Sequence, residues 1–126
     1  MEFDQPKGIY QQIADQMRDR ILAGEWQDGE RIPSVRELAV GLGVNPNTVT
    51  KSYQALLDRE LIENHRGLGY FVAADAKLRV LAEIREQFER EELPRVFRTM
   101  RLLGMRLADL EPHFARSDVE QAPGER

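Results

Sequence analysis

Apolar residues recur at helical spacing in the first part of the chain. The positions that share this spacing, four residues apart, are Ile9, Ile13, Met17 and Ile21. Residues spaced in this way lie on one side of a helix. Gly24 follows the last of them and can end the helix, because glycine readily adopts a positive φ. The pattern therefore predicts a helix over residues 9–23 with a buried apolar stripe, preceded by a loose arm at residues 1–8. Trp26, just beyond, is expected to be a core residue.

Two short amphipathic stretches separated by a glycine come next. Pro33 prevents a helix from continuing through residue 33. Ser34 and Glu37 have the S-x-x-E spacing of a capping box. A short helix is therefore expected to begin at Ser34, whose hydroxyl has a phosphate contact as a second role. Gly43 can end that helix, and Asn45 is a favourable N-cap for the next one. Two short helices joined by such a turn form a helix-turn-helix.

The second of these helices, residues 45–57, has two chemically different faces. Its apolar face consists of Val49, Tyr53, Leu56 and Leu57. The opposite face has a single charge, Lys51, which is a candidate partner for phosphate or guanine. Short amides and hydroxyls near a helix N-terminus suit base edges and phosphate oxygens. The candidates for such contacts are Asn45, Asn47, Thr48 and Thr50. A neutral surface helix is the competing interpretation, and these residues alone do not decide between the two.

Two short runs with strand character follow the helix-turn-helix, at residues 61–64 and 70–72. The turn between them, residues 65–69, contains two glycines, which supply the positive φ values that a tight hairpin needs. The predicted fold class is therefore mainly α with a small β-hairpin. A winged helix-turn-helix over residues 1–73 is followed by a short C-terminal helical dimerisation region.

Beyond residue 73 the apolar positions continue at helical spacing. Roughly 40 helical residues are too few for an independent domain with its own ligand cavity, so the stripe needs a partner. The winged helix and a second copy of the chain are the two alternatives, and we favour a homodimer. We expect residues 74–116 to form the dimerisation region, where an effector would also bind if the protein has one, and residues 117–126 to be disordered. The residues expected at the dimer interface are Leu81, Phe88, Val96, Phe97, Met100, Leu103 and Leu107.

Two residues are expected to interrupt or end helices in this C-terminal region. Pro94 either begins a new helix or kinks the preceding one, and the sequence leaves both interpretations open. Gly104 is expected to end a helix, with a further short helix beginning near Leu107.

Composition restricts the range of functions. The 126 residues include no cysteine, which excludes disulfides and thiolate metal sites and fits a reducing compartment. No apolar run is long enough to span a bilayer and no signal-peptide pattern is present, so a cytoplasmic protein without membrane contact is expected. We find no Ser-His-Asp arrangement, metal-ligand spacing or Gly-rich phosphate loop. The sequence therefore predicts neither an enzyme nor a bound cofactor or metal.

The net charge of −4 weighs against nucleic-acid binding, but its distribution reduces the objection. Residues 1–30 hold three basic and seven acidic residues, whereas residues 31–72 hold five basic and four acidic residues. The candidate DNA-reading part is therefore mildly positive. Because phosphate neutralisation supplies most of the non-specific binding energy, we expect modest affinity for each protomer, and specific binding that depends on two copies.

Several motifs in a fixed order closely resemble the DNA-binding domain of the GntR family of bacterial transcription regulators. They are G-E-R-I-P-S-V-R-E-L-A from Gly29, G-V-N-P-N-T-V from Gly43 and R-G-x-G-x-F-V from Arg66, preceded by Tyr10, Gln12 and Ile13. The resemblance spans about residues 8–73. It departs from the family pattern at Asp28, where proline is common, and at Glu60, where glycine is common. The C-terminal part resembles the short, YtrA-like branch of the family.

This resemblance implies a homodimeric, sequence-specific DNA-binding regulator, most simply a repressor. Arg36 would grip a phosphate or a guanine edge; a surface ion pair with Glu37 or Asp58 is its competing role. Two-fold symmetry would place recognition helices in successive major grooves, so the operator should be an inverted repeat. The wing residues that would enter the minor groove or touch phosphates are His65, Arg66 and Gly67. The alternative function is a winged-helix module that binds a protein partner with little dependence on salt.

Overall fold

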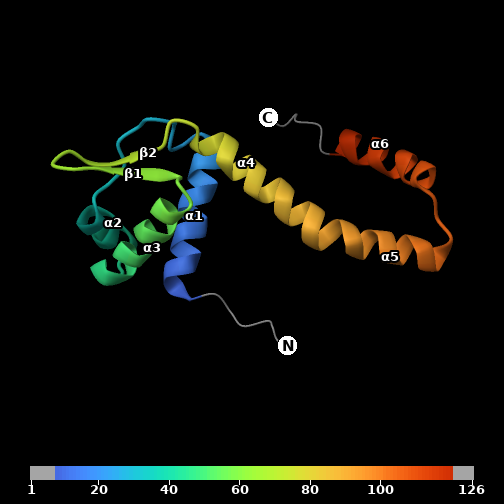
Figure 1. Cartoon of the computed structure of the whole chain (residues 1–126), viewed down its shortest axis with the longest axis horizontal. Coiled ribbons are helices and arrows are strands. Elements are labelled where there is room, and N and C mark those ends of the chain that lie inside the picture. Colours follow the sequence, from blue (N-terminus) through green and yellow to red (C-terminus); the bar gives the residue numbers. More distant parts are fainter. Residues whose placement is uncertain (1–7, 121–126) are drawn as a thin grey trace. The chain divides into compact units, whose positions relative to one another are not determined.

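Residues 8–120 are described in the computed structural model of the chain, and they are mostly helical with one two-stranded hairpin (Figure 1). The predicted fold class is confirmed. The chain divides into two units, Met1–Ile84 and Arg85–Arg126. The arm expected at residues 1–8 falls, except for Gly8, outside the described residues. No helix within residues 8–120 is both long and apolar enough to cross a membrane.

The first unit contains the helix-turn-helix and the hairpin. Its elements are α1 (Ile9–Ala23), α2 (Val35–Leu42), α3 (Pro46–Asp58), β1 (Ile62–His65), β2 (Gly69–Val72) and most of α4 (Ala76–Gln87). The bounds of α1 agree with the prediction. β1 includes His65, which the sequence placed in the turn, so only residues 66–68 connect the two strands. The unit also extends beyond the boundary expected at residue 73, because Ala76 and Val80 of α4 are fully buried in its core.

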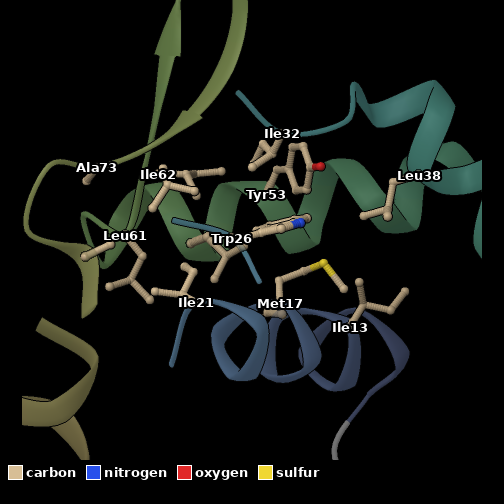
Figure 2. Packing of buried hydrophobic residues seen from close by; sticks show 14 of the residues in the cluster. Ile13, Met17, Ile21, Trp26, Ile32, Leu38, Tyr53, Leu61, Ile62 and Ala73 are labelled. Carbon is tan, nitrogen blue, oxygen red and sulfur yellow. The ribbon is translucent and has the colours of Figure 1, made fainter. Parts of the chain in front are cut away.

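The hydrophobic core of the first unit lies between α1, α3 and the base of the hairpin (Figure 2). Met17 and Ile21 of α1 face this core, and Trp26, only 6% exposed, is buried among them as predicted. Ile9 is an exception to the predicted stripe, because 55% of its side chain is exposed. It is the first residue of α1 and lies one helical turn before Ile13, which is the first α1 residue of the core.

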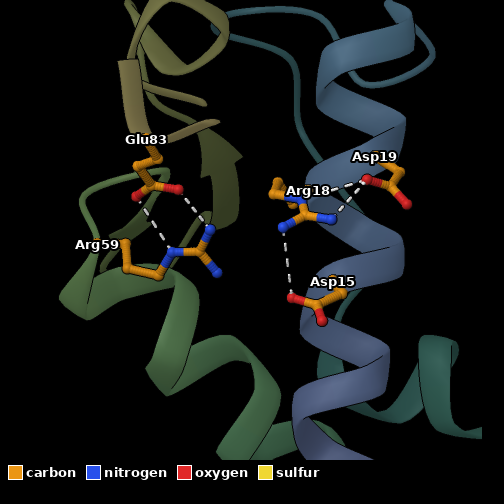
Figure 3. Close-up of polar contacts among 5 residues, drawn as sticks. All are labelled: Asp15, Arg18, Asp19, Arg59 and Glu83. Atoms are coloured by element: carbon orange, nitrogen blue, oxygen red, sulfur yellow. Dashed lines mark hydrogen bonds and ion pairs between the residues drawn. The ribbon is translucent and has the colours of Figure 1, made fainter. Parts of the chain in front are cut away.

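Polar contacts between distant residues also join the elements of this unit. The buried hydroxyl of Ser52 lies 2.9 Å from the carbonyl oxygen of Tyr10, which joins α3 to α1. Arg59, directly after α3, donates two hydrogen bonds to the carboxylate of Glu83 on α4, at 3.2 and 2.5 Å (Figure 3). These bonds raise the pKa of Arg59 above its ordinary value. Arg59, one of the basic residues of the candidate DNA-reading part, is therefore already paired within the unit.

The segment before α2 pairs with the outer edge of the hairpin, which the sequence did not reveal. β1 and β2 pair antiparallel, with Ile62 opposite Val72 and His65 opposite Gly69. Arg31 forms an isolated antiparallel bridge with Phe71 on the free edge of β2. The N–H of Ile32 donates to the carbonyl oxygen of Tyr70 at 2.9 Å. The segment before α2 is thereby attached to the wing, which covers part of an otherwise open sheet edge.

The C-terminal end of α3 is closed by a Schellman motif in which the left-handed residue is not glycine. Glu60 has φ 61°, a conformation that glycine adopts at much lower cost. Its N–H donates to Leu57 at 2.9 Å, and the N–H of Leu61 donates to Leu56 at 2.9 Å, which is the hydrogen-bond pattern of the motif. The departure from the family pattern noted in the sequence thus coincides with a strained backbone position.

Replacing Glu60 by glycine is therefore expected to stabilise the protein. Relief of the left-handed strain contributes about 1 kcal/mol, and it outweighs the exposed ion pair of Glu60 with Arg79, worth about 0–1 kcal/mol. Urea denaturation at a fixed protein concentration measures the change. Glu60→Ala is the control, because it removes the same ion pair and keeps the strain. A Glu60→Gly variant no more stable than Glu60→Ala would contradict this account.

The second unit consists of short helical segments. They are the end of α4, a π-helical turn (Phe88–Glu92), α5 (Leu93–Leu103), a 3₁₀ turn (Leu107–Leu110) and α6 (Glu111–Glu120). Pro94 is the second residue of α5, directly after the π-helical turn, so the helical backbone changes type there instead of stopping. The N–H of Leu93 donates to Phe88, five residues back, which is the pairing of a π-helix. Proline cannot donate to the carbonyl of Arg90, four residues before it, and this explains why the regular pattern is interrupted here.

The end of α5 agrees with the prediction, whereas the tail differs from it. Gly104 has φ 71° and ends α5. α6 extends to Glu120, so residues 117–120 are helical where disorder was expected. Pro112 near the start of α6 suits a first helical turn, whose N–H groups have no helical partner. Residues 121–126 of the predicted tail lie outside the described residues.

Candidate nucleic-acid-binding surface

The start of α3 is fixed by its cap. The side-chain oxygen of Asn45 accepts a hydrogen bond from the N–H of Asn47 at 2.7 Å, and Pro46 occupies the first turn. Gly43 ends α2 with φ 69°, so the two helices of the helix-turn-helix are separated by a very short turn. The prediction that Asn45 caps α3 is confirmed. Its side-chain oxygen is occupied by this cap, which leaves its amide group as the part of Asn45 able to donate to DNA.

The polar face of α3 forms an exposed stripe along the first two turns. Asn47, Thr50 and Lys51 are exposed, whereas Thr48 is half-buried at the border with the core. Within the described part of the chain, no side chain forms an ion pair or hydrogen bond with Lys51. The side chains of Asn47, Thr50 and Lys51 therefore point into solvent with their hydrogen-bonding groups available. The stripe contains no acidic residue before Asp58.

The first turn of α2 adds another exposed cation to the helix-turn-helix. Arg36 is exposed, and neither of its two candidate partners pairs with it. The carboxylate of Glu37 accepts from the N–H of Ser34 at 2.9 Å, and Asp58 accepts from Gln54 at 2.9 Å. Among residues 8–120 no ion pair or hydrogen bond engages the guanidinium of Arg36. The competing structural role for Arg36 is thus not observed.

Ser34 serves as the cap of α2, as predicted. Its hydroxyl oxygen accepts from the N–H of Glu37 at 3.0 Å and completes a reciprocal capping box. Tyr53 is also used structurally. Its hydroxyl donates to the carbonyl oxygen of Pro33 at 2.6 Å, so this hydrogen is engaged within the fold. Burial of the phenol, with 1% of Tyr53 exposed, raises its pKa.

The wing carries the second group of candidate residues. The ring of His65 stacks on Phe71 with centroids 4.3 Å apart, and its Nε2 lies 2.8 Å from a carboxylate oxygen of Glu63. Arg66 is exposed and forms no ion pair or hydrogen bond within the region that the structure describes. Gly67 has φ 79° and leaves the backbone of the turn open to close approach. His65 is therefore held on the sheet, whereas Arg66 extends freely from its end.

Sequence reasoning did not include Arg31 among the candidate DNA-binding residues, although the fold places it against the wing. Its guanidinium lies over Gly69, where an added Cβ would be 3.1 Å from Nε. Glycine suits position 69 for two reasons. Its φ of 114° is unfavourable for other residues, and a side chain there would crowd the guanidinium of Arg31. Arg31 is exposed and has no ion-pair partner in the portion of the chain described. The signal in the sequence was only its position in the motif before Pro33; its bridge to Phe71 depends on the fold.

The candidate dimerisation residues differ in their exposure. In α4 of the first unit, Leu81 is 45% exposed. In the second unit, Met100 is only 7% exposed and Phe97 is half-buried, and both line a cavity of about 270 Å³. The remaining candidates in the second unit expose 39% or more of their surface: Phe88, Val96, Leu103 and Leu107. If these exposed apolar side chains form a contiguous patch, it is the kind of surface that binds another protein chain.

Comparison with known proteins adds to this geometry. Residues 9–72 match the family described as bacterial regulatory proteins, gntR family. The chain is 37% identical over 118 residues to the HTH-type transcriptional repressor YtrA of Bacillus subtilis, covering 94% of this chain and 90% of that protein. It is 36% identical over 104 residues to the HTH-type transcriptional regulator YhcF of the same organism, which is described as uncharacterized, covering 82% and 84% of the two chains. A crystal structure described as a GntR-family regulator from Bacteroides thetaiotaomicron is 42% identical, with a TM-score of 0.78 over 90% of this chain and 99% of that one.

Proposed function

The chain belongs to the GntR family of bacterial transcription regulators, with a DNA-binding domain, and from this premise we propose that it acts as a homodimeric repressor that binds an inverted-repeat operator. The observation that carries the proposal is the exposed stripe of Asn47, Thr50 and Lys51 at the start of α3. An acid-free stripe of amides, hydroxyls and one cation at a helix N-terminus suits the floor and walls of a major groove. Repression is supported by similarity to a protein named as a repressor over nearly the whole chain.

In this proposal each protomer reads DNA with two elements. α3 enters the major groove, where Asn47 and Thr50 contact base edges and Lys51 contacts a phosphate or guanine; a good bidentate pair contributes about 1–3 kcal/mol of discrimination. Arg36, at the start of α2, grips the adjacent phosphates. The wing approaches the minor groove through Arg66, because a narrow minor groove has an enhanced negative potential that attracts arginine. Ser34 and Asn45 act mainly by fixing the helices that carry these contacts.

Dimerisation is supported by the apolar surface of the C-terminal helices. Leu103 and Leu107 in the second unit are 64% and 67% exposed, and burying them in a second copy would remove this apolar area from water. A two-fold dimer sets two copies of α3 in successive major grooves about 34 Å apart, which requires an inverted repeat. It also doubles the few phosphate contacts that a protomer with net charge −4 can make. We place this activity in the cytoplasm, where a bacterial regulator meets its operator.

The repressor proposal is tested by transcription in vitro. The purified chain is titrated onto a template in which its selected operator overlaps the promoter, with a scrambled operator as the control template. We expect transcript to fall as the operator becomes occupied, and to stay constant on the scrambled template. An increase in transcript from the operator template would contradict repression. Saturable association of the polar face of α3 with a protein, insensitive to salt and without DNA binding, would favour the protein-interaction alternative.

Replacing Arg31 by alanine is expected to weaken operator binding and to lower its salt dependence. A free guanidinium beside the wing neutralises roughly one phosphate for each protomer, so the slope of log affinity against log salt should fall by about 1 per protomer. Fluorescence anisotropy at several salt concentrations measures the slope. Arg18→Ala is the matched control, because Arg18 is paired with Asp19 on α1 at 3.0 Å. Equal slopes for Arg31→Ala and the wild type would remove Arg31 from the DNA-binding surface.

A further inference from the structure

Leu68 is an exposed apolar residue in the turn of the wing. It lies among the three residues that connect β1 to β2, and 65% of it is exposed. It is not one of the apolar residues packed against the core of the first unit. The fold therefore gives Leu68 no packing role in the core of the first unit within the described residues.

The turn geometry isolates this side chain. The N–H of Leu68 donates to the carbonyl oxygen of His65 at 2.8 Å, which closes the turn and fixes the backbone of Leu68. Gly67 and Gly69, on either side, have φ values of 79° and 114° and carry no side chains. No neighbouring Cβ covers Leu68 from these two positions. It is consequently an apolar projection on a backbone that is held in place by the sheet.

Two unpaired cations belong to the same end of the hairpin as Leu68. Arg66 is two residues before Leu68, and the guanidinium of Arg31 lies over Gly69, one residue after it. An apolar side chain at the same end of the hairpin as two free guanidinium groups fits the minor groove of DNA, where phosphates line both edges and stacked base pairs form the floor. Side chains such as leucine can enter between base steps there, partly unstacking and bending the duplex.

We propose that Leu68 is a wedge that enters the minor groove of the operator and partly unstacks one base-pair step in each half-site. The proposal rests on the proposed function, because it requires the wing to lie on DNA. It makes Leu68 a specificity-determining residue that responds to how easily a DNA step deforms, and not to the hydrogen-bonding groups of the bases. Pyrimidine–purine steps unstack more easily than A-tracts, so the operator should carry such a step beneath the wing.

The test combines base-stacking fluorescence with binding. 2-Aminopurine, whose emission rises when it is unstacked, is placed in turn at each adenine flanking the major-groove half-sites of the selected operator. The full-length wild type is compared with Leu68→Ser, which removes the apolar group, and with Leu68→Met, which retains it. Val40→Ser is the matched control, because Val40 is a 78% exposed apolar residue on α2, outside the wing. Affinity is also measured for operators with the deformable step and with an A-tract at that place.

We expect the wild type, Leu68→Met and Val40→Ser to raise the emission at one step of each half-site, and Leu68→Ser to leave it unchanged. The wild type should prefer the deformable step by about 10-fold, and Leu68→Ser should lose most of this preference. Operator binding by the wild type without any rise in emission would overturn the wedge and leave the proposed function intact. Equal discrimination by Leu68→Ser and the wild type would do the same. Failure of the wild type to select any operator would overturn both.

Discussion

Replacing Asn47 and Lys51 together by alanine is expected to abolish selective DNA binding while leaving the fold intact. Both side chains are exposed, and the helix cap uses only the backbone N–H of Asn47. The variant loses a base contact and a cationic contact from each protomer, at about 1–3 kcal/mol for a base contact, so operator affinity should fall by at least about 100-fold. Fluorescence anisotropy on the selected operator measures the loss, and circular dichroism checks the helical content.

A matched pair of substitutions separates this effect from a general loss of polar surface. Gln16→Ala with Lys77→Ala removes an exposed amide from α1 and an exposed ammonium from α4, neither of which belongs to the candidate surface. This control should bind the operator within about 2-fold of the wild type, since surface substitutions away from special features have small effects. Wild-type affinity in the Asn47/Lys51 variant would show that α3 is not the recognition helix.

Replacing Tyr53 by alanine is expected to lower the free energy of unfolding of the first unit severely without unfolding it at room temperature. Tyr53 is 1% exposed and makes an edge-to-face contact with Tyr70 of the wing, with ring centroids 4.8 Å apart. Truncating a buried aromatic residue costs about 3–5 kcal/mol, which is a large part of the usual 5–15 kcal/mol of stability. Urea denaturation followed by tryptophan fluorescence reports on this unit directly, because Trp26 is in the same core.

Tyr53→Phe separates packing from the hydrogen bond. It keeps the ring and removes only the hydroxyl that donates to the part-buried carbonyl of Pro33, so its cost should be about 0.5–1.5 kcal/mol, the net worth of one hydrogen bond. All variants are compared at one protein concentration, because dimerisation makes apparent stability depend on concentration. Equal destabilisation by the two substitutions would contradict the conclusion that Tyr53 acts mainly through packing.

The helices were predictable because the signals that begin and end them are local. Gly24 ends α1, the reciprocal pair of Ser34 and Glu37 begins α2, and Asn45 begins α3, each through bonds to residues at most four positions away. The exposure of Lys51 followed from the same helical periodicity. These features need no knowledge of the tertiary fold, and for this reason the sequence was sufficient to identify them.

Contacts between distant segments were not predictable in the same way. Arg31 joins the wing by bridging Phe71, and Arg59 is paired with Glu83 on another helix. The sequence shows both arginines only as positive charges, and it cannot say that one is free beside the wing and the other is already paired. The hydroxyl of Tyr53 is a similar case, because its acceptor is the backbone of Pro33, whose position is set by the fold.

Selection of operators from a randomised duplex pool by the wild-type chain, at two salt concentrations, tests the central claim most directly. We predict enrichment of an inverted repeat whose half-site centres are about one helical turn, ~34 Å, apart, with weaker binding at the higher salt concentration. Enrichment of a single unpaired half-site would contradict the dimeric mode of binding. An absence of enrichment at low salt would contradict the conclusion that α3 and the wing read DNA.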